Sequence, residues 1–216
     1  AIFYQRPCSF IVFNIDNFRV FRAEQGELVA EEVLKKIPTT ASGLKDLYEK
    51  EIRRCERFLD GFYGSHNNVT ANDWLNWLIL AAGSFIVKGW RDVEKSVIAG
   101  YHWFGVWGRD TFVSLPGLML VTGRFEEAKE VFLTFSRRIE GGLIPNLISE
   151  EGDLSAYNTV DATLWYVNAV LQYLKYTFDF QFVKDHLWKA LHEIIENHVA
   201  GTLFDIRVDA DGFLSH

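Results

Sequence analysis

The stretch from residue 100 to residue 110, GYHWFGVWGRD, sets large aromatic side chains beside an Arg-Asp pair. Sugars present flat apolar C–H faces and rings of hydroxyl groups, so a sugar-binding site combines aromatic rings with side chains that form paired hydrogen bonds. The candidate residues of this kind are Trp103, Phe104, Trp107, Arg109 and Asp110. A structural alternative stays open, in which Asp110 stabilises the first turn of a helix, Arg109 pairs with it and the rings fill a core.

A second candidate stretch covers residues 141–170, where glycines, a proline and several acids indicate a long loop between helices. Loops of that length in compact domains are commonly functional. Asn158 is a plausible N-cap, which puts Asp161 at the third helical position and Trp165 one turn later on the same face. Asp161 could close a capping box, or aromatic neighbours could desolvate it, raise its pKa and make it a general acid. We expect Glu150, Glu151 and Asp153 to form the solvated rim of the loop.

The spacing of apolar residues predicts the helices that position these groups. A single apolar stripe is typical of a helix with one face in water, whereas a helix that is apolar all round must be covered on most faces. Stripes occur from Leu44 to Phe62, in 124–140 and in 180–198, where the last one includes Phe182, Leu187, Ile194 and Ile195. The segments 72–87, 110–122 and 158–177 are apolar nearly all round, and Pro116 is expected to kink the second of them.

This alternation of covered and striped helices predicts a mainly α protein built as part of a double-layered helical toroid. A helical bundle or a solenoid is the alternative, although no fixed-length repeat of the solenoid kind is present. The inner helices of a toroid run in one direction, so the starts of 110–122 and 158–177 would lie at the same mouth. We therefore expect Arg109, Asp110 and Asp161 to converge on one pocket.

The N-terminal part of the chain has a different pattern. Residues 8–24, CSFIVFNIDNFRVFRAE, favour strands, and Pro38 begins a linker-like break before the first helix. This predicts that residues 1–37 end an upstream β-rich domain and that 38–216 are the first part of the helical domain. The first residue is Ala1, so we expect the chain to belong to a longer protein, whose remainder would complete the toroid and cover apolar faces left open here.

Composition excludes several classes of protein. The chain has 216 residues, of which 49% are hydrophobic, and a net charge of -7, so it is globular and not disordered. No long uninterrupted apolar run predicts a membrane span, and no basic cluster predicts a nucleic-acid surface. Cys8 and Cys55 fit no metal spacing, which favours a reduced, cytoplasmic protein without structural disulfides. We expect no metal or organic cofactor. A neutral polyol fits the acidic charge balance better than a phosphorylated substrate.

Three motifs occur in a fixed order: AGYHWFGVWGRDTFVSLPGL, GGLIPNLI and YNTVDATLWY. Together they resemble the glycogen debranching enzymes, in their amylo-α-1,6-glucosidase domain. The resemblance implies an (α/α)6 toroid of the six-hairpin glycosidase type, preceded by a β-rich domain. It also implies inverting hydrolysis of α-1,6-linked glucose at the branch points of glycogen-like α-glucan. His102 and Val106 depart from the family's commoner YPWFGDWGRD form, which puts the shape of the subsite in doubt.

The resemblance also suggests roles for single residues. Asp161 would be the general acid, and Arg109 with Asp110 would bind the non-reducing glucose. The residues expected to line the subsite are Trp103, Trp107, Asn146, Tyr157 and Asn158.

An inverting enzyme needs a second carboxylate roughly 6.5–9.5 Å from the acid to activate water. The resemblance places that base beyond residue 216, so we expect this segment to be inactive by itself. The alternatives are another inverting six-hairpin glycosidase, glucoamylase-like or trehalase-like, and a non-catalytic helical domain that binds glycan or protein.

Overall fold

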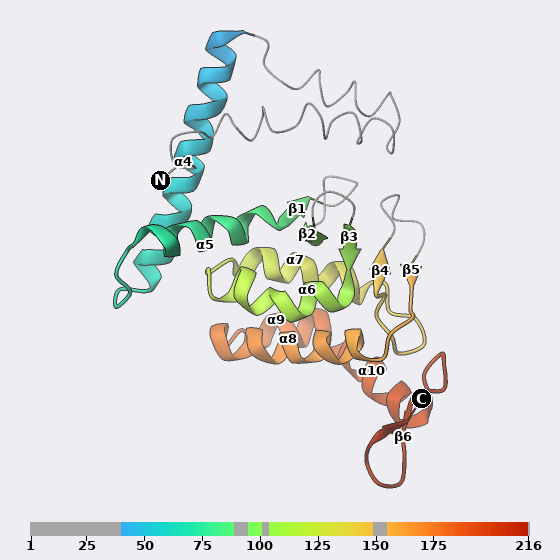
Figure 1. The fold of residues 1–216 in the computed structure, drawn as a ribbon. Helices are drawn as coiled ribbons and strands as arrows, with labels where there is room; N and C mark the ends of the chain where they lie inside the picture. The colour runs from blue at the N-terminus through green and yellow to red at the C-terminus, as the bar shows by residue number, and fades with distance from the viewer. Residues whose placement is uncertain (1–39, 89–94, 101–103, 149–154, 216) are drawn as a thin grey trace. The chain divides into compact units, whose positions relative to one another are not determined.

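A computed structural model describes residues 40–88, 95–100, 104–148 and 155–215 (Figure 1). The predicted upstream β segment, Trp103, His102 and the acidic rim of the long loop lie outside these residues, and the predicted domain boundary stays a prediction. The chain divides into two compact units, residues 1–64 and 65–216. The described part of the first unit, residues 40–64, is almost entirely helix α4 (Ala41–Ser65), which confirms the helix predicted from Leu44 onward.

The second unit is mainly helical, as predicted. Its helices are α5 (Asp73–Ser84), α6 (Gly108–Leu115), α7 (Phe125–Ser136), α8 (Asp161–Thr177), α9 (Phe180–Phe182) and α10 (Trp188–Ala200). Two π-helical segments, η1 (Pro116–Leu120) and η2 (Val183–Leu187), continue α6 and join α9 to α10. The backbone changes from α to π geometry at Pro116, and the predicted kink stays a prediction. Proline has no N–H to donate to the preceding turn. The hydrogen bond from Val121 N to Pro116 O, at 2.9 Å, spans five residues, which is the pattern of a π-helix.

A five-stranded antiparallel sheet in the order β1-β2-β3-β4-β5 accompanies the helices. Its strands are β1 (Ile86–Lys88), β2 (Lys95–Gly100), β3 (Phe104–Trp107), β4 (Leu147–Ile148) and β5 (Ser155–Ala156). The sequence did not predict this sheet, because strands of two to six residues are too short to show a clear alternation of apolar and polar side chains. The predicted long loop is in part the β4–β5 hairpin, which pairs with β3 where Trp107 faces Leu147. A separate hairpin, β6 (Arg207–Val208) and β7 (Leu214–Ser215), closes the described chain.

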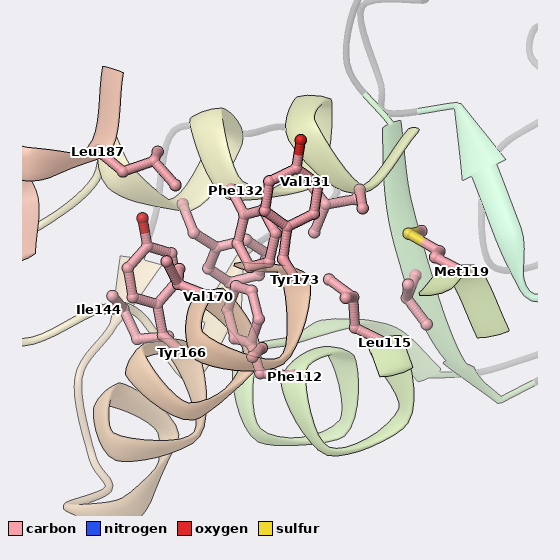
Figure 2. Packing of buried hydrophobic residues seen from close by; sticks show 14 of the residues in the cluster. Phe112, Leu115, Met119, Val131, Phe132, Ile144, Tyr166, Val170, Tyr173 and Leu187 are labelled. Carbon is pink, nitrogen blue, oxygen red and sulfur yellow. The ribbon is translucent and has the colours of Figure 1, made fainter. Parts of the chain in front are cut away.

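The core lies between α6, η1, α7 and α8 (Figure 2). Phe112 makes edge-to-face contacts with Phe135 at 4.8 Å and with Tyr166 at 5.0 Å between ring centroids. Burying each such aromatic side chain contributes about 1.5–3 kcal/mol to folding. The stripe predicted for 124–140 is confirmed on α7, where four side chains are fully buried: Ala128, Val131, Phe132 and Phe135.

Helices α6 and α8 run in the same direction. Arg109 contacts Asp161 at their first turns, and Phe112 contacts Tyr166 one turn further along both helices. Figure 1 shows the two helices lying alongside each other. The predicted common direction of these two helices is therefore confirmed, whereas the closed toroid stays a prediction.

Apolar side chains remain exposed on the outer faces of several helices. Trp74 on α5 is 67% exposed, Val113 on α6 is 49% exposed and Leu171 on α8 is 52% exposed. These exposed side chains agree with the expectation that apolar helix faces are left uncovered among the described residues. The placement of Ile195 in the buried stripe of 180–198 was wrong, because Ile195 is 60% exposed. Within α10 the buried residues Ala190, Ile194 and His198 recur every four residues, and Ile195 lies about 100° further round the helix than Ile194, on the exposed side.

Candidate active site

Helix α6 starts directly at the end of strand β3, without a side-chain cap from the preceding residue, Trp107. Asn146, on the segment before β4, supplies the missing acceptors. Its backbone carbonyl accepts from Gly108 N at 2.9 Å, and its side-chain Oδ1 accepts from Arg109 N at 3.2 Å. The first amides of a helix have no partner within the helix, so Asn146 performs for α6 the work of an N-cap from a distant position in the chain.

This cap requires a close approach of two backbones. A Cβ atom on Gly108 would collide with the carbonyl oxygen of Pro145 and lie 3.4 Å from the Cα of Asn146. Both of those atoms belong to the backbone and cannot turn aside. Glycine at position 108 is therefore needed for packing, and its absent side chain lets Asn146 reach the first amides of α6.

The start of α8 differs from the sequence prediction. The helix begins at Asp161, and Val160 precedes it without a side-chain cap, so the prediction that Asn158 is the N-cap was wrong. The Oδ1 of Asn158 instead accepts a 3.5 Å hydrogen bond from the Nδ2 of Asn146. Asp161 is consequently the first helical residue and not the third. An acid at that position still interacts favourably with the positive end of the helix dipole.

The guanidinium of Arg109 binds the carboxylate of Asp161 across the two helix starts. Its Nε lies 3.0 Å and its Nη2 2.7 Å from the same oxygen, Oδ1. These hydrogen bonds raise the pKa of Arg109. The two side chains are 49% and 42% exposed, and a pair so exposed contributes less than about 1 kcal/mol to stability. The importance of the pair is therefore its placement and not its contribution to stability.

The aromatic neighbours do not desolvate Asp161 in the way that the sequence suggested. Trp165, one turn along α8, is 38% exposed, and the Asp161 side chain keeps 42% of its surface open to solvent. Tyr157 is half-buried and its hydroxyl donates to the backbone carbonyl of Arg138 at 2.7 Å. Burial raises the pKa of Tyr157, and the nearby charge of Glu140 adds to that effect.

Asp110 lies beside Arg109 on the exposed side of the first turn of α6. Both residues border an apolar depression to which β2, α6 and η1 contribute Val97, Ile98, Val113 and Leu118. Asp161 meets Arg109 directly but is not among the residues that line this depression. Arg109 is thus the residue common to both, since it contacts Asp161 and borders the depression with Asp110.

The remaining candidates have mixed positions. Trp107 is half-buried at the end of β3, Asn158 is exposed, and Asn146 is only 4% exposed. Sequence reasoning missed the capping by Asn146 and the buried hydrogen bond from Ile144 N to Thr163 Oγ1 at 3.0 Å. A glycine at a strand-to-helix junction was the signal that a close backbone contact is needed there.

Neither membrane nor metal features emerge in the described part of the chain. None of its helices has both the length and the hydrophobicity that crossing a membrane requires. The same residues contain no group of three or more His, Cys, Asp or Glu side chains that could hold a metal ion.

The fold and these contacts define the class: a mainly helical domain with a charged site where two parallel core helices begin, next to a strand rich in aromatic residues. Residues 80–216 match the family described as amylo-alpha-1,6-glucosidase. The match covers more than half of the chain, so this chain belongs to that family, and the resemblance indicated by the three motifs is confirmed.

A relative with a known name supports the same assignment. Over 84 residues the chain is 44% identical to the glycogen debranching enzyme of Saccharomyces cerevisiae (strain ATCC 204508 / S288c). The aligned region is 37% of this chain and 5% of the yeast protein, so the chain spans only a small part of that relative.

Proposed function

We propose that this chain is part of a cytoplasmic glycoside hydrolase that removes α-1,6-linked glucose from the branch points of glycogen-like α-glucan, with inversion at the anomeric carbon. The observation that carries the proposal is the Arg109–Asp161 contact at the joined starts of α6 and α8, in a chain of the amylo-alpha-1,6-glucosidase family. The name of the yeast relative supports an α-glucan substrate.

In this proposal Asp161 is the general acid that protonates the glycosidic oxygen. Arg109 and Asp110 bind hydroxyl groups of the terminal glucose, and Trp103, Trp107, Tyr157 and Asn158 belong to the surrounding subsite. A general acid must carry a proton, and the guanidinium of Arg109 occupies the Oδ1 oxygen of Asp161. Oδ2 of Asp161 is left to carry that proton, although the positive charge of Arg109 favours the ionised carboxylate. We therefore expect Arg109 to turn toward the sugar hydroxyls when glucose binds.

The inverting mechanism also needs a base that activates water on the opposite face of the sugar, roughly 6.5–9.5 Å from the acid. We assign no described residue to that role. Without the base, Asp161 could protonate a leaving group but no water would be activated to replace it. Residues 1–216 by themselves are accordingly expected not to turn over substrate.

The test is hydrolysis by the full-length protein of a maltooligosaccharide that carries one α-1,6-linked glucose. Release of β-glucose, detected by NMR before mutarotation, is expected and would establish inversion. Asp161→Asn should reduce turnover by about 10²–10⁴-fold while binding of the glucan survives. A matched control is Asp185→Asn on η2, an exposed aspartate whose partner, Gln181 Nε2 at 2.6 Å, can donate equally well to an amide oxygen.

Other outcomes would favour the alternatives. Preferential hydrolysis of maltose would indicate a glucoamylase-like enzyme, and of trehalose a trehalase-like one. If the full-length protein hydrolyses none of these substrates, a non-catalytic binding domain becomes the better interpretation. If Asp161→Asn leaves hydrolysis intact, Asp161 is not the general acid, and the domain described here is better interpreted as a non-catalytic part of an active protein.

A further inference from the structure

We propose that Asn146 is a positioning residue, which keeps Arg109 and Asp161 in register, and that it does not contact the sugar. This inference rests on the proposed function. It replaces the subsite role that the sequence resemblance suggested for Asn146.

Every polar group of Asn146 already has a partner in the protein. Its backbone carbonyl and its Oδ1 accept from Gly108 N and Arg109 N, at 2.9 and 3.2 Å. Its own N–H donates to Ala156 O at 2.7 Å, and its Nδ2 donates to Asn158 Oδ1 at 3.5 Å. Since the residue is 4% exposed, little of its surface is open to a ligand.

The partners of Asn146 lie on both sides of the candidate site. Gly108 and Arg109 begin α6, while Asn158 lies three residues before Asp161 at the start of α8. Asn146 therefore bridges the start of α6, which carries the guanidinium, and the segment that leads into α8, whose first residue carries the carboxylate. A change in the Arg109 backbone would move the guanidinium relative to Oδ1 of Asp161.

The segment around Asn146 is itself tied to α8. Ile144 N donates to Thr163 Oγ1 at 3.0 Å, and Thr163 is fully buried in the first turn of that helix. On the other side, Leu147 pairs with Trp107 in β3 and with Ala156 in β5. Residues 143–148 are thus held to α6, α8 and the sheet together, and Asn146 supplies the only side-chain hydrogen bond among the described residues that reaches the start of α6 from this segment.

A residue with a merely structural role would lower stability without changing the reaction of the folded enzyme. Geometry matters more for a catalytic pair, because a displacement of about 1 Å between reacting groups can cost roughly 100-fold in rate. A structural role and a positioning role therefore predict different kinetics for the folded protein. Kinetics can distinguish the two roles even if both lower thermal stability.

The experiment compares Asn146→Ala, Asn146→Asp and Thr202→Val in the full-length protein, with the branched maltooligosaccharide as substrate. The alanine variant loses the acceptor for Arg109 N, and its kcat should fall about 10- to 100-fold. KM should rise by a smaller factor, because Arg109 itself binds glucose in the proposed function. The aspartate variant keeps the acceptor for Arg109 N, at a helix start that favours negative charge, but loses the 3.5 Å donor to Asn158 Oδ1. It should therefore restore most of kcat, to within about fivefold of the parent.

Thr202→Val is the matched control, because Thr202 is also buried and its Oγ1 also accepts from a backbone amide, Ile206 N at 3.1 Å. It should lower Tm and leave kcat and KM unchanged. A kcat for Asn146→Ala within about threefold of the parent would overturn the proposal. A rise in KM alone, shared by the aspartate variant, would show that Asn146 contacts the sugar and would overturn it too.

Hydrogen exchange of the parent protein supplies a test that needs neither activity nor a folded variant. If Asn146 caps α6, the Arg109 amide is protected from exchange, and rapid exchange of that amide would refute the cap and with it the proposal. Should the parent hydrolyse no branched substrate, the proposed function fails, whereas the exchange result still decides whether Asn146 holds Arg109.

Discussion

Two ion pairs bind helices of the core near opposite ends of α8, and their carboxylates differ in how completely they are bonded. At the start of α8, the described hydrogen bonds from other side chains to Asp161 all come from Arg109 and all reach Oδ1. Just beyond the end of α8, the two oxygens of Asp179 accept from three groups. Lys129 Nζ and the Tyr173 hydroxyl bind Oδ2, at 3.0 and 2.9 Å, and Phe182 N binds Oδ1 at 3.1 Å.

The difference indicates two kinds of carboxylate. Asp179 caps α9, and its hydrogen bonds, that from Phe182 N first and then those from Lys129 and Tyr173, lower its pKa. It is also the less exposed of the two, at 29% against 42% for Asp161. A carboxylate with both oxygens engaged holds helices together, whereas one bound through a single oxygen to one exposed arginine can exchange that partner for a ligand.

The largest effect expected from this comparison is on turnover. Asp161→Asn should reduce kcat of the full-length protein by about 10²–10⁴-fold, the usual contribution of a general acid. Asp179→Asn should leave kcat almost unchanged, because Asp179 contacts α7 and α9 and is not part of the candidate site. Steady-state kinetics of both variants on the branched oligosaccharide would check this, and equal losses would erase the distinction between the two carboxylates.

A smaller loss of activity is expected from Gly108→Ala. The new Cβ would press on the Pro145 carbonyl and separate Asn146 from the start of α6, so kcat should fall by about tenfold or more. Gly117→Ala is the control, because nothing lies within 4 Å of a Cβ at that helical position. Alanine there should be neutral or stabilising by up to about 1 kcal/mol. Thermal melts and kinetics of both variants would measure the contrast, and a harmless Gly108→Ala would contradict the close approach.

On stability the order of the two aspartates should be reversed. Asp179→Asn should lower Tm more than Asp161→Asn, since asparagine accepts through one oxygen only and Asp179 uses both of its oxygens. The Asp161 pair is exposed, so its loss should cost less than about 1 kcal/mol. Differential scanning calorimetry would give both values. A larger drop for Asp161→Asn would mean that its ion pair is mainly structural.

The smallest effect is a pH dependence specific to Asp179. Its pKa is lower in the folded protein than in the unfolded chain, so its contribution to stability is present above the ordinary aspartate pKa of about 3.9 and is lost as pH falls through the folded value. The Tm difference between the parent and Asp179→Asn should therefore shrink as pH is lowered from about 6 toward 3. A difference that stays constant over this range would show that the carboxylate charge contributes nothing.

Several parts of the fold could be predicted because their signal is local. The stripe of α7 repeats every three to four residues, and Phe132 and Phe135 are buried as that repeat requires. Local patterns failed at the edge of an apolar stripe and in short strands. Ile195 follows the buried Ile194 by one residue and lies outside the buried stripe of α10, and the short strands β4 and β5 left too few residues for any alternation to show.

At the candidate site, the sequence by itself determined which residue types are available and which family the chain belongs to, because Arg109, Asp110 and Asp161 lie in short motifs that can be compared directly. Only the tertiary structure decided how they are held. Asn158, which the sequence predicted as the cap of α8, does not cap that helix. Asn146, which is 37 residues from Arg109 in the chain, caps α6 instead. Capping by a distant residue depends on where two chain segments meet after packing, and the packing of the buried core, which no local window of sequence contains, sets that meeting point. The sequence shows Gly108 but not the backbone that approaches it.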